Sequence, residues 1–213
     1  MQIRFAIPAE TRRPGKSHRY DVFGPKIGRS LTFFHPRALD RWIDLERDPA
    51  VTWYCERPVR INDGKFKRLV DFYAIRQEKE ELSFILKPGE DPDCSPQELF
   101  GPGFVQWCHQ SEIAVHLVDS EPASSNRQIM TNNWGHVLRE LSAFGRYVPT
   151  QLTDSVLLEL SKPRTLDELQ LHYPKVDPIL LKVASFSLLH RGLASCAGIE
   201  QQPFSSSLPF SAL

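Results

Sequence analysis

Three strand-like segments in the first half of the chain restrict the fold more than any other feature. They comprise residues 51–61, 67–76 and 82–86, and each is rich in aromatic, β-branched and aliphatic residues. An Asn-Asp-Gly sequence at 62–64 separates the first two, and such residues accept the positive backbone angles that a tight hairpin turn needs. Charged residues at 77–81 form a second turn. The chain therefore needs a β-sheet whose first strands follow one another along the sequence.

Helical patterns surround these strands. Residues 36–46 place apolar side chains at helical spacing, and Asp48-Pro49 ends that helix. A second helix is expected at 95–109, broken near the Gly-Pro-Gly at 101–103, and is followed by a buried strand at 113–118. The order of elements is that of an α/β core, which several folds share.

The C-terminal part reads as a separate helical module. Residues 124–148 are largely helical, and we place the boundary after them, at Tyr147-Val148-Pro149. Three short helices follow, of which one begins at a capping box formed by Thr165 and Glu168 and the last ends at Gly192. This pattern is compatible with a winged-helix-type module that binds DNA and equally with a small helical cap that does not.

We therefore divide the chain into a basic N-terminal arm (1–30), an α/β domain (31–148), a helical domain (149–200) and a tail (201–213). The tail is rich in Ser and Pro but carries apolar residues such as Phe204 and Phe210. These residues could dock on a partner or fold back on the parent domain.

Charge is distributed unevenly although the net charge is zero. Residues 1–30 hold seven Lys or Arg and two Asp or Glu. Such an arm can follow a phosphate backbone, or it can be a solvated tail. The candidate DNA-binding residues are Arg12, Arg13, Lys16, His18, Arg19, Lys26 and Arg29.

The sequence favours a cytoplasmic protein that does not enter a membrane. It contains no apolar run of about eighteen residues and no secretory signal. The four cysteines form no CxxC pair, so disulfides are not expected in a reducing compartment. A zinc site from Cys94, Cys108 and His109 would match no common structural zinc spacing.

One acidic residue lies in an apolar strand. Asp71 is flanked by apolar residues, and a buried carboxylate needs a metal, a cation or a hydrogen-bond partner. Lys87, at the end of the next strand, is the natural partner across a short hairpin. From these residues alone, the two could form part of a metal site or a structural ion pair.

The order of several short motifs resembles that of the TnsA family, the DNA-cutting subunits of two-part cut-and-paste transposases. The resemblance covers roughly residues 15–120. Its motifs are Gly15-Lys16-Ser17-His18-Arg19, Ile27-Gly28-Arg29, Asp48-Pro49-Ala50-Val51, Glu56-Arg57-Pro58, Asp71-Phe72 and Lys87-Pro88. The resemblance implies a restriction-endonuclease-like mixed-sheet core followed by a winged-helix-type C-terminal domain. It also implies Mg²⁺, with Asp71 and Lys87 as catalytic residues and Asp71 as a metal ligand.

Two further groups that the resemblance implies are absent. A Glu on the first helix corresponds to Ala38, and a Glu or Gln two residues before the lysine corresponds to Ile85. With one carboxylate left, we expect poor affinity for Mg²⁺.

Three nearby side chains could be considered as substitutes. His35 lies one helical turn before Ala38 and could reach a metal. Asp40 is about 200° around the helix from that position and should point elsewhere. Glu46 lies about two turns further on and is expected at the surface.

The resemblance implies a TnsA-like component of a DNA transposition complex. It would act at transposon ends with an integrase-type transposase and an AAA+ regulator. The missing groups favour reduced or lost 5′-strand cleavage and an assembly role. The alternatives are an active metal-dependent endonuclease that uses Asp71, Lys87, His35 and Glu56, a DNA-binding adaptor, and a restriction-type defence nuclease.

Overall fold

The computed structural model describes residues 3–15, 17–91, 93–119 and 125–213 and divides into two compact units. The first unit comprises Met1–Leu45 and Ala50–Pro122, and the second comprises Glu46–Pro49 and Ala123–Leu213. The division lies before the helical segment 124–148, not after it, because the long helix in this segment packs against the last helix of the chain.

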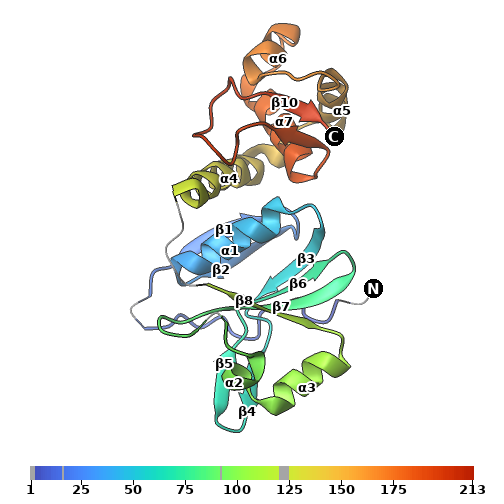
Figure 1. Cartoon of the computed structure of the whole chain (residues 1–213). Coiled ribbons are helices and arrows are strands. Elements are labelled where there is room, and N and C mark those ends of the chain that lie inside the picture. Colours follow the sequence, from blue (N-terminus) through green and yellow to red (C-terminus); the bar gives the residue numbers. More distant parts are fainter. Residues whose placement is uncertain (1–2, 16, 92, 120–124) are drawn as a thin grey trace. The chain divides into compact units, whose positions relative to one another are not determined.

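A four-stranded mixed sheet forms the centre of the first unit (Figure 1). The strands lie in the order β3 (Val51–Glu56), β6 (Phe72–Arg76), β7 (Lys79–Ile85) and β8 (Ala114–Val118). β6 is antiparallel to both β3 and β7, whereas β8 is parallel to β7. A parallel neighbour needs a crossover connection, and two helices between β7 and β8 provide it. The expected mixed α/β architecture is therefore confirmed.

The first two strand segments expected from the sequence are each interrupted. β3 ends before Pro58, which has no N–H to donate to a strand ladder, and the preceding Arg57 has a φ of +47°. The second segment breaks at Asp71. Between these two breaks, β4 (Arg60–Asp63) and β5 (Phe66–Leu69) pair as a separate hairpin. Asp71 therefore lies immediately before β6 and not inside a strand.

The two faces of the sheet are covered by different layers (Figure 1). On one face, α1 (Pro36–Arg47) packs through Trp42, whose indole N–H donates to the Tyr54 hydroxyl at 2.8 Å. On the other face lie α2 (Pro96–Phe100) and α3 (Pro102–Gln110), and the Phe84 and Phe100 rings stack at 4.0 Å. In each contact the strand residue, Tyr54 of β3 or Phe84 of β7, is fully buried.

A hairpin that the sequence did not predict spans the end of the expected basic arm (1–30) and the residues just after it. β1 (Tyr20–Gly24) pairs with β2 (Arg29–Phe33). The residues before it are also attached to the first unit. The Phe5 ring packs on Tyr73 with ring centroids 5.1 Å apart, the Phe5 carbonyl accepts the Trp53 indole N–H, and the Ala9 N–H donates to the Arg57 carbonyl at 2.8 Å.

The second unit is mostly helical. Its elements are α4 (Ser125–Phe144), the 3₁₀ turn η1 (Gly145–Tyr147), α5 (Thr150–Glu159), α6 (Leu166–His172), α7 (Pro178–His190), β9 (Ala194–Cys196) and β10 (Phe210–Ala212). The three short helices and the Thr165–Glu168 capping box at the start of α6 are confirmed.

The C-terminal tail folds back on this unit. β10 pairs with β9, and Phe210 is fully buried. Of the two possibilities for the tail, folding back on the parent domain is therefore confirmed. The expected surface position of Glu46 is wrong, since its side chain is fully buried and its carboxylate lies 2.6 Å from His190 Nε2.

No helix among the described residues combines the length and the apolar character that a membrane span requires.

Gly101, between α2 and α3, is expected to be essential for stability. Its φ of +86° and ψ of +157° lie in a region that only glycine occupies readily, and a Cβ there would come within 2.7 Å of Asp63 Oδ2. Gly101→Ala should lower the free energy of unfolding by about 1–3 kcal/mol in urea denaturation. Gly145→Ala is the matched control, because a Cβ at Gly145 meets nothing within 4 Å. Equal effects of the two substitutions would contradict this account.

Candidate functional site

Asp71 and Lys87 line one cleft of the first unit. The cleft has a volume of about 550 Å³. It lies where β6 begins and β7 ends, with the first turn of α1 and the β4–β5 hairpin beside it. The lining residues are His35, Arg37, Arg60, Lys67, Arg68, Leu69, Asp71, Ile85, Leu86, Lys87 and Pro88. Among these described lining residues, Asp71 is the one carboxylate, and five of the others are Lys or Arg.

The Asp71 carboxylate is held by the backbone of β7. Its Oδ2 accepts the N–H of Ile85 at 2.8 Å, and its Oδ1 lies 3.8 Å from His35 Nε2. The main chain is also fixed, since the Asp71 N–H donates to the Ser83 carbonyl and the Asp71 carbonyl accepts the Arg57 N–H. Within the part of the chain that the structure describes, no ion pair joins Asp71 to Lys87. The structural ion pair considered from the sequence is therefore not formed.

His35 connects Asp71 to the start of α1. Its Nδ1 accepts the Ala38 N–H at 3.2 Å, so the neutral ring carries its proton on Nε2, which faces Asp71. Binding a metal through Nε2 would move that proton to Nδ1, and the Ala38 N–H would keep only the His35 carbonyl, at 3.2 Å, as an acceptor. His35 is thus near Asp71, as its position in the sequence suggested, but it acts there as a helix cap.

Apolar side chains occupy both positions where the resemblance implies metal-binding groups. The Ser83 hydroxyl accepts from Arg41 of α1, and Ile85 is two residues further along the same strand, so both face the α1 layer. Ile85 is 7% exposed and Ala38 is 6% exposed. These two side chains provide packing and no ligand atom.

Two other carboxylates considered for the site have partners elsewhere. The Asp40 Oδ2 atom lies 3.4 Å from Arg37 Nη1. The Glu56 carboxylate accepts two hydrogen bonds from Arg29, at 2.6 and 3.0 Å. Glu56 does not line the Asp71 cleft. With these carboxylates engaged and cationic side chains around Asp71, the donor set does not fit a resident Mg²⁺ ion.

The described residues contain no group of three or more His, Cys, Asp or Glu side chains placed to hold a metal ion. This includes the cysteines considered for zinc. Cys108 is buried, and burial raises the pKa of its thiol to about 11.

Arg68 forms the floor of the cleft. Its side chain is 9% exposed, and its guanidinium donates to both oxygens of Glu90 at 2.8 Å and to the Ile85 carbonyl at 2.7 Å. The same guanidinium lies over the Phe84 and Phe100 rings. It therefore ties β5 to the end of β7.

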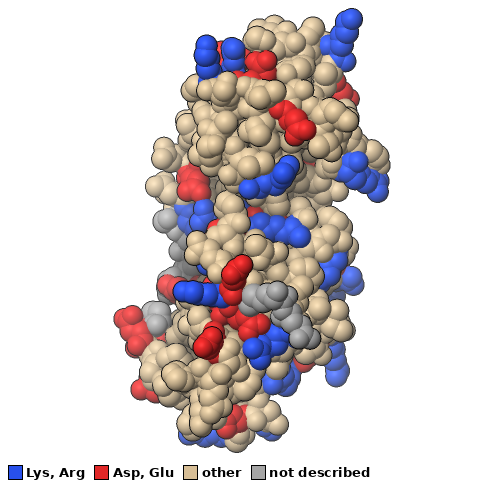
Figure 2. Space-filling model, turned by 90° about the vertical axis from the view of Figure 1, so that its right-hand side faces the viewer, with Lys and Arg blue, Asp and Glu red and all other residues tan. Residues whose placement is uncertain are grey.

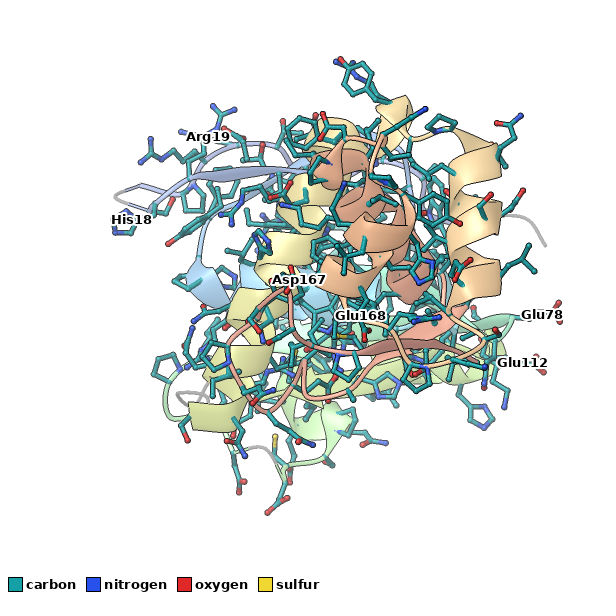
Figure 3. All side chains as sticks on the ribbon, turned by 90° about the horizontal axis from the view of Figure 1, so that it is seen from above. His18, Arg19, Glu78, Glu112, Asp167 and Glu168 are labelled. Atoms are coloured by element: carbon teal, nitrogen blue, oxygen red, sulfur yellow. The ribbon has the colours of Figure 1, made fainter. Side chains whose placement is uncertain are left out.

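The candidate DNA-binding residues differ in how the fold engages them. Lys26 donates to the Leu45 carbonyl, Arg29 pairs with Glu56, and Arg19 pairs with Asp21. Figure 3 shows His18 and Arg19 at the edge of the molecule, on the loop before β1, with side chains that point outward.

The remaining candidates in this group are less engaged or not described. Arg12 and Arg13 are exposed, and the Arg13 guanidinium donates to the Ser17 carbonyl. Lys16 lies outside the described residues. The fold therefore leaves part of this group available to an anion.

Several basic residues of the cleft were not identified from the sequence. Arg37, Arg60 and Lys67 belong to no motif, and they come together only because the β4–β5 hairpin turns toward the start of α1. The basic residues at 65, 67 and 68, next to a turn, were the one available signal. Figure 2 shows Lys and Arg side chains interspersed with Asp and Glu side chains over the face it displays.

Comparison with protein-family models finds no family that matches the chain, and comparison with curated proteins finds no match.

The Arg68–Glu90 ion pair should make stability depend on pH. Burial acts to raise the pKa of Glu90, but hydrogen bonds from the Lys87 N–H and from Arg68 outweigh burial, and the pKa lies below its ordinary value. A carboxyl with a lowered folded-state pKa stabilises the fold above its unfolded-state pKa of about 4.3. That contribution is lost as the pH falls through the folded-state pKa.

We therefore expect Glu90→Gln to lower the free energy of unfolding at pH 7, with a difference from wild type that shrinks below about pH 4. Urea denaturation across this pH range measures the difference. Glu78→Gln is the control, because Glu78 is exposed at the β6–β7 turn, where Figure 3 shows its side chain pointing outward. A difference of the same size at pH 3 and pH 7 would contradict the interpretation.

Proposed function

We propose that the chain is a TnsA-like component of a DNA transposition complex that binds DNA at transposon ends and has lost most or all strand cleavage. The observation that carries the proposal is the cleft in which Asp71 and Lys87 occur together among basic side chains. The positions that should complete a nuclease site hold Ala38 and Ile85. Such a cleft keeps the affinity for a phosphate backbone while it lacks the ligands of a metal-dependent nuclease.

The arrangement of elements in the first unit supports a restriction-endonuclease-like core. A helix precedes the sheet, the acidic residue stands at the start of one strand, and the lysine follows the end of its antiparallel neighbour. The parallel strand β8 then joins on the far side of β7 after a helical crossover. This mixed sheet is compatible with the restriction-endonuclease-like core that the TnsA resemblance implies.

The second unit supports a role in assembly more than in reading DNA. Three helices followed by the β9–β10 hairpin are compatible with a winged-helix-type module. However, α7, the helix that would enter a DNA groove, is mostly buried, and its Lys182 is paired with Glu140. Residues 46–49 and 123–213, which make up this unit, hold nine Lys or Arg and nine Asp or Glu, so the unit has no basic excess. We assign it to contacts with the integrase-type transposase or the AAA+ regulator.

Loss of cleavage predicts a specific response to metal ions. In isothermal titration calorimetry, wild-type protein should bind Mg²⁺ and Mn²⁺ weakly. The Asp71→Ala variant should bind both ions with the same low affinity as wild type. Ala38→Glu combined with Ile85→Gln should bind Mn²⁺ about tenfold more tightly or better, because the variant adds a carboxylate and an amide oxygen. Circular dichroism should show that both variants remain folded.

A cleavage assay on supercoiled plasmid, with Mg²⁺ or Mn²⁺ present, accompanies this titration. Wild-type protein should produce no nicked DNA. Efficient nicking that Asp71→Ala abolishes would sink the proposal of lost cleavage.

DNA binding by the cleft predicts a salt dependence. Lys67 and Lys87 are exposed and have no ion pair within the described residues, so each can meet a phosphate. The combined variant Lys67→Gln and Lys87→Gln should bind a duplex oligonucleotide more weakly. The plot of log affinity against log salt should become less steep by about 0.9 for each phosphate that the variant no longer neutralises.

Fluorescence anisotropy between about 50 and 300 mM salt is a suitable measurement, because the counterion effect is large in this range. Lys162→Gln combined with Lys175→Gln, at exposed positions of the second unit, is the matched control and should bind like wild type. Asp71→Asn should not weaken binding. If the cleft variant and the control bind alike, DNA does not contact this cleft.

A further inference from the structure

A second cleft of the first unit lies beside the β1–β2 hairpin. Its volume is about 340 Å³, and it is smaller than the cleft at Asp71. Its lining includes four arginines, one glutamate and several hydroxyl groups. The arginines are Arg13, Arg19, Arg29 and Arg57, and we call this site the arginine cleft.

Arg57 is the arginine of this cleft that most lacks a counter-charge. Its guanidinium lies over the Phe34 ring at 4.6 Å, and its Nη1 donates to the Arg12 carbonyl at 3.3 Å. Its Nε is buried and has no hydrogen-bond partner, and no carboxylate among the described residues lies within 4.0 Å of it. Burial lowers the pKa of Arg57, and the more distant Glu56 and Glu10 oppose this only in part.

The backbone holds Arg57 in a conformation that side chains rarely adopt. Its φ is +47°, which is unfavourable for a residue other than glycine and persists only where surrounding contacts fix it. The Arg57 N–H donates to the Asp71 carbonyl, and the Arg57 carbonyl accepts the Ala9 N–H, each at 2.8 Å. The guanidinium is therefore positioned before any ligand arrives.

The one carboxylate in the arginine cleft is already neutralised. Glu56 accepts two hydrogen bonds from Arg29, and the Arg29 Nε is also buried without a partner. Arg19 is paired with Asp21. Arg13 donates only to a backbone carbonyl and has no ion pair among the described residues. Two positive charges in the cleft, on Arg13 and Arg57, thus have no ion-pair partner among the described residues. Two N–H groups, at Nε of Arg29 and of Arg57, have no hydrogen-bond acceptor.

We propose that the arginine cleft binds a phosphate group of a DNA backbone. Guanidinium groups present planar pairs of donors that match phosphate oxygens, and an anion would supply the partners that Arg13 and Arg57 lack. The Thr11 and Ser30 hydroxyls line the same cleft and can donate further hydrogen bonds.

The two clefts are neighbours along the chain. Phe34 lines the arginine cleft, and His35 lines the Asp71 cleft. The Arg57 N–H also bonds to the Asp71 carbonyl. A strand bound at Asp71 can therefore continue to Arg57. This inference rests on the proposed DNA-binding function and adds a defined phosphate position to it.

Titration of the full-length protein with inorganic phosphate tests the site without DNA. The arginine Nε–H resonances in ¹H–¹⁵N spectra are the readout, since the Nε atoms of Arg29 and Arg57 have no partner. We expect a saturable shift of these two resonances. The shift of Arg29 should be lost in Arg57→Gln and weakened in Arg13→Gln, whereas Arg191→Gln, an exposed arginine of the second unit, should behave like wild type.

Arg13→Gln keeps the test decisive if Arg57→Gln fails to fold, because the Arg13 side chain is exposed. No saturable shift in wild type, or an equal shift in wild type and both cleft variants, would overturn the proposed site.

Binding of a duplex oligonucleotide separates the sources of the phosphate. If the source is DNA, Arg13→Gln and Arg57→Gln should each weaken binding, and the salt dependence should become less steep by about 0.9. If inorganic phosphate binds but DNA does not, the source is a small phosphate ester, and the DNA-backbone proposal and the proposed function both fail. If DNA binds equally to wild type and both variants, the arginine cleft is rejected while the proposed function stands.

Discussion

The buried guanidinium of Arg68 is the interaction on which the arrangement around the first cleft depends. A charge that is 9% exposed is tolerated only when its donors are satisfied, and Arg68 satisfies them with the Glu90 carboxylate and the Ile85 carbonyl. Its position over the Phe84 and Phe100 rings links the β4–β5 hairpin to the aromatic layer beneath the sheet. The β4–β5 hairpin carries Arg60 and Lys67, which line the cleft. The contacts of Arg68 hold this hairpin in place and thereby position both basic side chains.

The same geometry explains why Asp71 is poorly suited to hold a metal. One carboxylate oxygen accepts the Ile85 N–H, and the other faces a histidine whose proton is directed toward it by the cap of α1. The absent ligand groups and the engagement of Asp71 by the β7 backbone both weaken this site for a metal. What remains chemically is a surface for phosphate oxygens.

Much of the fold could be predicted from periodicity, whereas the details of the site could not. The Asn-Asp-Gly turn and the segments rich in aromatic and β-branched residues indicated the strands, and the Thr165–Glu168 box indicated the start of α6, because these are local signals. The end of β3 coincides with a positive φ at Arg57, which no composition predicts for an arginine. The burial of Glu46 depends on His190, which is 144 residues away.

The attachment of residues 5–9 to the first unit has a consequence for kinetics and thermodynamics. Phe5 packs on Tyr73, and Ala9 donates to the Arg57 carbonyl, so this segment is ordered before any encounter with a ligand. The conformational entropy of ordering it is lost during folding and not during association. A partner that binds the arginine cleft would thus contact a segment that is already ordered. Binding there should show a small change in heat capacity, whereas the folding of a free tail on binding gives a large one.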